Sequence, residues 1–351
     1  MMPINKRLKR ELKKNFAKYF FIGLVLFMGI TIISAFFTAT DGIMSTIESQ
    51  QSDCNIEDAN VTLVSQLSDD NISRLHEIGI NDLEDTSYCD VTALDDSDYT
   101  MRVFRVRDSV DKLSLIEGEL PANDKQIVLE SKTASAKDLS VGDEIDVDGK
   151  NYTLSGIVAV VDYNNVLQTV SSGVSNLKTF GLGFVSKQAF DGLDSAKMTI
   201  QYSLTAEDEQ SIDDAYNYLM DEEIAVNILK QSDNPRIKSI SDKTNTLKAE
   251  VTLISVVFVL LMVFIFYAMT SASVEKDSNL IGTFFSMGYT RWEIIQHYVR
   301  LPLIITLIGS VLGMITGSLL FAEPIGKITY STYSLPTFSG KVNLYLIIMC
   351  C

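Results

Sequence analysis

Two long stretches of the chain, residues 251–273 and 301–321, contain no charged residue. About 20 apolar residues in a helix, at 1.5 Å each, cross the hydrocarbon core of a bilayer. A third stretch, residues 16–40, carries only Lys18, near its start, where a lysine side chain can reach the interface. We therefore predict membrane helices over residues 16–40, 251–273 and 300–322. Residues 342–351 read as the truncated start of a fourth.

A cleaved signal peptide is the alternative for residues 16–40, because basic residues precede them. The apolar run is longer than the roughly 7–15 residues of a signal-peptide core, and no small-x-small cleavage site follows it. We predict an uncleaved helix. Basic residues mark the cytoplasmic side of such helices. Residues 1–15 and 274–299 are then cytoplasmic, and residues 41–250 and 323–341 are extracytoplasmic. The basic residues at the N-terminus are Lys6, Arg7, Lys9, Arg10, Lys13 and Lys14.

The predicted outer block, residues 41–250, holds most of the acidic residues of a chain with 45 Asp and Glu against 29 Lys and Arg. We interpret its acidic runs as solvated surface, because their spacing does not match a calcium-binding EF-hand loop. Two cysteines, Cys54 and Cys89, fall in this block. A single bridge between them stays open, because sequence gives no Cα separation.

Strand and helix patterns alternate through the outer block, which predicts a mixed α/β domain. Asp148-Gly149 between alternating apolar residues is typical of a two-residue hairpin turn. The stretch from Thr205 to Asp208 reads as a capping box. It would begin a helix with one apolar face, formed by Ile212, Ala215, Tyr216 and Leu219.

The segment that returns to the membrane has apolar or small residues at alternating steps of three and four. Such a heptad pattern predicts one continuous helix that rises from the bilayer as a stalk, with Ile43 and Ile47 as a partner face. An ordinary juxtamembrane helix with a chance pattern is the alternative. The stalk residues are Ile237, Ile240 and Leu247, within the series Ile237, Ile240, Thr244, Leu247, Val251 and Ile254.

The predicted cytoplasmic segment, residues 274–299, combines a short amphipathic helix, a glycine turn and the start of a new helix. Gly288 suits the residue just after a helix, where φ is positive. Thr290 and Glu293 are spaced as a capping box. A passive helix lying in the membrane interface is the alternative. One helical face would collect Ile281, Phe284, Phe285, Gly288, Trp292 and Ile295.

Three glycines in the third predicted span, Gly309, Gly313 and Gly317, recur every four residues. Small residues at this spacing let membrane helices approach closely. We expect them to pack against the first or second helix or a second copy of the chain. Glycine at its ordinary membrane frequency is the alternative.

The cytoplasmic segment resembles the conserved loop of FtsX/MacB-type ABC transporter permeases. The matching residues are Glu275-Lys276, Ile281-Gly282, Met287-Gly288 and Thr290. Residues 117–121, 127–129, 141–143 and 152–158 resemble the MacB-like extracytoplasmic core domain. The expected fold is an integral membrane α-helical bundle, with three full transmembrane helices and the start of a fourth, and an inserted α/β extracytoplasmic domain.

The resemblance implies a permease subunit in a bacterial plasma membrane, coupled to a separate ABC ATPase subunit and to a second permease copy or half. ATP binding would draw the permeases together, and the stalks would carry this motion outward to export or extract a peptide, lipoprotein or other amphipathic substrate. A non-transporting sensor of antimicrobial peptides or regulator of a cell-wall hydrolase is the alternative, and a membrane-anchored binding module without an ATPase is a third. By analogy the ATPase contacts are apolar at Phe284, Phe285, Met287 and Tyr289, and polar at Glu275, Lys276 and Arg291.

The sequence lacks the signatures of catalysis and of cofactor binding. There is no phosphate-binding G-x-x-x-x-G-K-[ST] loop, so ATP and Mg are expected on the partner ATPase. His76 and His297 fall in different predicted compartments, which excludes a shared metal or nucleophile site. No charge lies mid-span, which argues against a proton relay. We expect no catalytic residue, no metal and no nucleic-acid partner, and the lipid bilayer as the surrounding medium.

Overall fold

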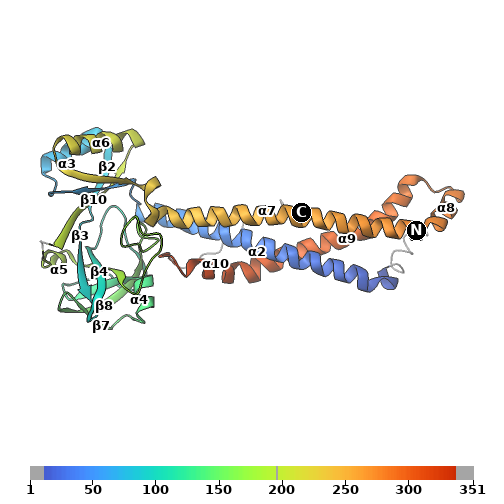
Figure 1. The fold of residues 1–351 in the computed structure, drawn as a ribbon, viewed down its shortest axis with the longest axis horizontal. Helices are drawn as coiled ribbons and strands as arrows, with labels where there is room; N and C mark the ends of the chain where they lie inside the picture. The colour runs from blue at the N-terminus through green and yellow to red at the C-terminus, as the bar shows by residue number, and fades with distance from the viewer. Residues whose placement is uncertain (1–11, 195–196, 337–351) are drawn as a thin grey trace. The chain divides into compact units, whose positions relative to one another are not determined.

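The computed structural model describes residues 12–194 and 197–336 (Figure 1). These residues form two compact units. A helical unit contains the described residues up to Ile43 together with Thr244–Lys327. An α/β unit contains Met44–Lys243 and the described residues from Ile328 onward. The predicted basic N-terminus lies largely outside the described residues, and the predicted fourth helix, residues 342–351, lies outside them entirely.

The helical unit is built from three helices long and apolar enough to cross a membrane. Within it α2, α7 and α9 run side by side (Figure 1). Lys248 Nζ on α7 pairs with Asp41 Oδ1 on α2 at 2.7 Å. The helices are α2 (Phe16–Cys54), α7 (Pro235–Lys276) and α9 (Arg291–Thr316), and α9 continues through a π-helical turn, η3 (Gly317–Phe321), into α10 (Ala322–Tyr330).

Helix α10 corrects the prediction of a loop beginning at residue 323. Pro324 has no N–H to donate to the preceding turn, but a proline inside a membrane helix is tolerated where a local π-helical adjustment satisfies the freed backbone groups. The π-helical turn immediately before α10 changes the hydrogen-bond step at this place. Glu323 and Lys327 then form an i,i+4 ion pair at 2.6 Å. The helix therefore continues to Tyr330, past the predicted end of the third span.

Helix α7 is a single helix from Pro235 to Lys276, as the heptad pattern predicts. Ile237 and Ile240 are buried and Leu247 is half-buried. Ile254 is 58% exposed, so the buried seam ends before it. Beyond that residue most apolar side chains of α7 are exposed, which suits a helix surrounded by lipid.

The first lobe of the α/β unit is an antiparallel sheet with two helices on one side (Figure 1). Leu75 and Ile80 lie in its core with Leu204 and Ala215. Its elements are β1 (Ala59–Leu63), α3 (Asp69–Ile78), β2 (Ile80–Asp85), β10 (Met198–Ala206), α6 (Glu209–Asp221) and β11 (Ala225–Lys230), followed by the 3-10 turn η2 (Gln231–Asp233).

The second lobe is a mixed sheet in which β4 pairs parallel with β9 and β6 pairs parallel with β8. Met101 and Val103 face one core while Phe104 faces another, so both faces of the sheet are covered. The first residues of β10 pair with β3 and join the lobes. The elements are β3 (Tyr88–Ala93), β4 (Asp96–Arg105), β5 (Ser114–Gly118), β6 (Gln126–Glu130), α4 (Ser131–Ala136), β7 (Glu144–Val147), β8 (Lys150–Ala159), β9 (Phe180–Val185) and α5 (Lys187–Asp191).

The predicted hairpin is confirmed. Strands β7 and β8 pair antiparallel around Asp148 and Gly149, which have φ values of 54° and 74° as a type I′ turn requires. The predicted capping box at Thr205 is wrong, because Thr205 belongs to strand β10. Its hydroxyl accepts a hydrogen bond from the backbone N–H of Asp82. Helix α6 begins later, with Asp208 as its N-cap.

Both cysteines of the α/β unit are free and buried, so the bridge left open by the sequence is not formed. Cys54 Sγ lies 3.1 Å from Ser114 Oγ, whereas Cys89 packs in the core of the second lobe. Cys54 is the last residue of α2, whereas Cys89 lies within β3, so the two thiols lie in different surroundings.

Candidate docking end of the helical unit

The site predicted from residues 274–299 begins where helix α7 ends. Asp277 separates α7 from a short helix, α8 (Ser278–Ser286). Aspartate, serine and asparagine compete with helical hydrogen bonding through their own side chains, and the sequence here is Asp277-Ser278-Asn279. The carboxylate of Asp277 accepts a hydrogen bond from the Tyr298 hydroxyl on α9 at 3.1 Å. The break therefore holds α8 near the start of α9.

A Schellman turn ends α8 and reverses the chain. Gly288 has a φ of +88°, in the region that glycine adopts without strain. The N–H of Tyr289 donates to the carbonyl of Phe284 at 3.1 Å, and that of Gly288 donates to Phe285 at 3.0 Å. The rings of Phe284 and Tyr289 pack edge to face with centroids 5.5 Å apart. The glycine turn predicted from sequence is confirmed, and the two aromatic rings brace it.

The start of α9 is fixed by the predicted capping box, which is also confirmed. The hydroxyl of Thr290 accepts from the N–H of Glu293 at 3.4 Å. The carboxylate of Glu293 in return accepts from the N–H of Thr290 at 2.9 Å. Two N–H groups that a helix start leaves without intrahelical partners are thereby satisfied.

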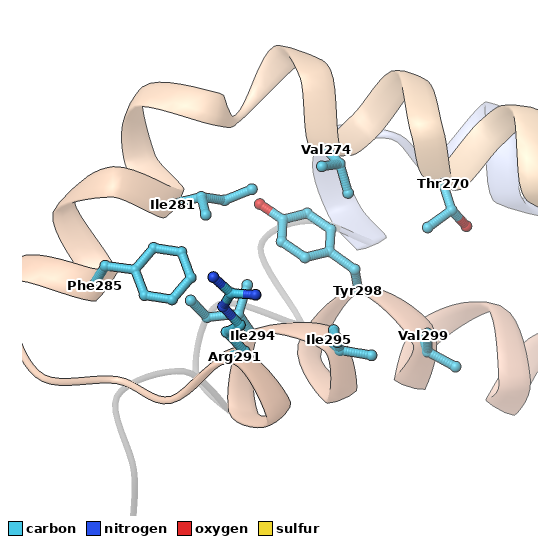
Figure 2. Close-up of a pocket in the computed structure, with 9 residues that line it drawn as sticks. All are labelled: Thr270, Val274, Ile281, Phe285, Arg291, Ile294, Ile295, Tyr298 and Val299. Carbon is cyan, nitrogen blue, oxygen red and sulfur yellow. The ribbon is translucent and has the colours of Figure 1, made fainter.

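The helices enclose an open apolar groove of about 310 Å³ (Figure 2). Arg291 is the one charged residue of its lining. Phe285 is 46% exposed at the groove, and Met287 and Trp292 beside it are 59% and 66% exposed. The lining residues come from α7 (Thr270 and Val274), α8 (Ile281 and Phe285) and α9 (Arg291, Ile294, Ile295, Tyr298 and Val299).

The ten residues assigned from the sequence to an ATPase-coupling helix belong to three elements rather than one helix. Glu275 and Lys276 lie exposed in the last turn of α7, because the helix breaks only at Asp277. Arg291 begins α9. The remaining residues lie in α8 or its turn: Ile281, Gly282, Phe284, Phe285, Met287, Gly288 and Tyr289.

The prediction that Trp292 and Ile295 share one helical face with the residues of α8 is wrong, because the turn at Gly288 reverses the chain before them. Ile295 nevertheless lines the groove from α9. Sequence reasoning missed five lining residues. Thr270 was placed in a predicted membrane span, and four residues of the predicted cytoplasmic segment were not assigned to its apolar face: Val274, Ile294, Tyr298 and Val299. Their spacing in the sequence could have indicated them, because residues four apart lie on one face of a helix. Thr270 and Val274 are spaced in this way, and so are Ile294 and Tyr298.

The three predicted packing glycines lie against α2. A Cβ on Gly309 would stand 2.7 Å from Leu26 Cδ2, and one on Gly313 would stand 2.8 Å from the carbonyl oxygen of Phe27. Gly317 faces Ala35 in the same way. These distances are shorter than ordinary contacts, so the α2–α9 interface has no room for a side chain at the glycine positions.

Hydroxyl groups continue the same interface toward the π-helical turn. Ser318 Oγ lies 2.8 Å from Ser34 Oγ and 2.9 Å from Thr38 Oγ1. Hydrogen bonds of this kind between helices satisfy polar side chains that lipid cannot. Among residues 12–194 and 197–336, no group of three or more His, Cys, Asp or Glu side chains is placed to hold a metal ion.

Three apolar helices of spanning length and a mixed α/β domain inserted between the first and second define a multi-pass membrane protein. Residues 252–350 match the family model of the FtsX-like permease C-terminal domain. This part of the chain is therefore similar to FtsX-like permeases, in agreement with the resemblance seen in the sequence.

Solved structures similar to the chain include extracytoplasmic parts of two transporters. The extracellular domain of the noncanonic ABC-type transporter YknZ from Gram-positive bacteria is 14% identical, with a TM-score of 0.31, over 48% of this chain and 100% of that one. The periplasmic region of MacB from Actinobacillus actinomycetemcomitans is 10% identical, with a TM-score of 0.31, over 56% and 92%. A domain of a putative permease protein from Porphyromonas gingivalis is 12% identical, with a TM-score of 0.28, over 47% and 84%. No curated protein matches the chain.

Proposed function

We propose that the chain is the permease subunit of an ABC transporter and that a separate ATPase subunit docks on the apolar groove between α8 and α9. The groove is the observation that carries the proposal. It lies within the part of the chain that matches the permease family, and its apolar lining is partly exposed. An exposed apolar surface of this kind is characteristic of a protein-binding site. The chain itself is expected to catalyse no reaction.

The proposal places the groove in the cytoplasm and the α/β unit outside the cell. Lysine and arginine residues gathered before α2 support this orientation by the positive-inside rule. Movement of the ATPase at the groove would then act on α9 and α7, and α7 continues without interruption into the α/β unit. The proposed work is export or extraction of an amphipathic substrate such as a peptide or lipoprotein.

Replacing Phe285 by Asp tests the docking surface. A charge there would have to be desolvated against an apolar partner, so we expect a large loss of ATPase co-purification, at least tenfold. Thr283→Asp is the matched control, because Thr283 is exposed on the same helix and is not part of the groove lining. Equal ATPase association by both variants and the native chain would contradict the assignment.

Transport and signalling are separated by reconstitution of the permease and its ATPase in liposomes. ATP turnover that a candidate substrate stimulates, together with movement of that substrate across or out of the bilayer, supports transport. Stimulated turnover with no movement of substrate would instead favour a sensor or a regulator of a cell-wall enzyme.

A further inference from the structure

Three acidic side chains and one arginine are buried together in the α/β unit. Glu57, Arg107, Asp111 and Asp162 are 1%, 4%, 0% and 5% exposed. Arg107 Nη1 donates to Asp162 Oδ1 at 2.6 Å, and the N–H of Glu57 donates to Asp111 Oδ1 at 2.8 Å. We call these four residues the junction cluster.

The junction cluster lies within the α/β unit, near the end of α2 and the start of α7. Glu57 follows the end of α2 by three residues, and Asn234 immediately precedes α7. Glu57 Oε1 accepts from Asn234 Nδ2 at 3.3 Å and from Asn60 Nδ2 at 2.7 Å. Its Oε2 accepts from the hydroxyl of Ser203 at 2.6 Å. The carboxylate of Glu57 thus joins three parts of the chain: the segment that follows α2, the segment that precedes α7, and strand β10.

Backbone hydrogen bonds connect the same segments. The N–H of Asp111 donates to the carbonyl of Asn55 at 3.0 Å, and the N–H of Gln231 donates to that of Asp58 at 2.8 Å. The incoming segment, residues 55–58, is therefore held between the loop that carries Asp111 and the outgoing segment, residues 231–234. The side chain of Asp111 has to stay in place for the first of these contacts, because its Oδ1 binds the N–H of Glu57.

The charges of the junction cluster do not balance when every group is ionised, because three carboxylates face one guanidinium. Burial raises the pKa of Asp111 well above its ordinary value, and the charges of Glu57 and Asp162 raise it further. Burial and Asp162 likewise raise the pKa of Glu57, although hydrogen bonds from Ser203 and Asn60 oppose this.

Arg107 contributes one positive charge to the junction cluster and keeps it. Burial opposes its charged form, but the carboxylates of Asp162 and Asp111 raise its pKa above the ordinary value, so it stays a cation. Asp111 Oδ2 has no hydrogen-bond partner among the described residues. Other titratable or charged groups nearby are the Cys54 thiol, Asp53, Lys112 and the Glu84–Arg105 pair.

We propose that the junction cluster is a proton-dependent latch, which holds the incoming and outgoing segments of the α/β unit together while Glu57 or Asp111 retains a proton and loosens them when that proton leaves. A buried site with an excess of negative charge is opened by ionisation, because two uncompensated carboxylates repel each other and draw in water. The proton goes to solvent, and no other chemical change is needed.

The direction of the pH dependence follows from linkage. The pKa values of the Glu57 and Asp111 carboxyls are higher in the folded chain than in the unfolded chain. The stability that the retained proton contributes is fully present below the unfolded pKa and is lost as the pH rises through the folded pKa. Acidic medium around the α/β unit therefore tightens the latch, and alkaline medium loosens it.

Hydrogen exchange on the full chain in nanodiscs tests the latch. The reporters are the amides of Glu57 and Gln231, with rates divided by the intrinsic chemical rate at each pH. For the native chain we expect opening to become more frequent with rising pH, approaching about tenfold per pH unit where one proton is lost. Protection that is independent of pH after this correction would overturn the proposal.

Isosteric amide variants locate the proton. Asp111→Asn and Glu57→Gln keep an oxygen acceptor but cannot ionise, so each is expected to flatten the pH dependence at least severalfold. Asp58→Asn is the matched control in the same segment, because Asp58 accepts from the N–H of Ala206 outside the cluster. The control should keep the native slope. Equal slopes in all three variants and the native chain would refute the assignment.

A measurement on the native chain covers the case in which a variant does not fold. A protonated carboxylic acid has an infrared carbonyl stretch that a carboxylate lacks. We expect such a band at neutral pH in the native chain and its disappearance as the pH is raised, in parallel with the loss of amide protection. Absence of the band at neutral pH would exclude the retained proton.

Discussion

Glycine positions on α9 and α8 differ in what surrounds them, and this difference gives a matched test at the scale of single residues. At Gly313 a Cβ would meet the backbone of Phe27 and the side chain of Ile30, at 2.8 and 3.1 Å. At Gly282 a Cβ would meet nothing within 4 Å. The first glycine therefore provides space for a neighbouring helix, whereas the second does not.

Alanine at Gly313 is expected to destabilise the helical unit by about 1–3 kcal/mol, because the helices must separate to admit the methyl group. Alanine at Gly282 is expected to be neutral or to stabilise α8 by up to about 1 kcal/mol, from its higher helix propensity. Thermal unfolding of the two variants in the same detergent measures the difference. Equal midpoints would contradict the close approach of α9 to α2.

At the scale of elements, the turn between α8 and α9 depends on one backbone conformation and one capping box. Gly288→Ala would force a side chain into the left-handed region at a cost of about 1–2 kcal/mol, whereas Gly288→Asn should cost less. Thr290→Ala would remove the cap of α9 at about 0.5–2 kcal/mol. We expect faster hydrogen exchange in α8 for Gly288→Ala and at the start of α9 for Thr290→Ala. Unchanged exchange in both would contradict this description of the turn.

Local signals predicted the elements well where the signal and its partner are close in the sequence. The Asp148-Gly149 hairpin, the turn at Gly288 and the Thr290 capping box each depend on neighbouring residues, and all three are confirmed. Thr205 shows the limit. Its spacing to Asp208 satisfies a capping pattern, but pairing of β10 with β2, more than a hundred residues away, decides its conformation.

The groove and the junction cluster were beyond sequence reasoning for the same physical reason. Tyr298 and Val274 come together only because α7 breaks at Asp277 and the chain reverses at Gly288. Glu57, Asp111 and Asp162 are far apart in the sequence, and in an acidic chain each reads as ordinary surface charge. Only the fold reveals that they are buried around one arginine.

For the whole molecule, the proposed orientation makes a prediction that does not depend on transport. A protease site inserted between Asp148 and Gly149, at the tip of an exposed hairpin, should be cut by protease added to intact cells. The same site inserted between Gly288 and Tyr289 should be cut only after the membrane is opened. The reverse pattern would contradict a cytoplasmic groove and, with it, docking of an ATPase there.

The hydrogen bond between Glu57 and Asn234 has a consequence for how such a chain can change over evolution. Because Glu57 and Asn234 are neighbours, the segment between the end of α2 and the start of α7 begins and ends at adjacent points. A short connector could replace it, or another domain with adjacent termini could be exchanged for it, without altering the spacing of the helices on either side. The segment between α2 and α7 can therefore be exchanged as a single piece.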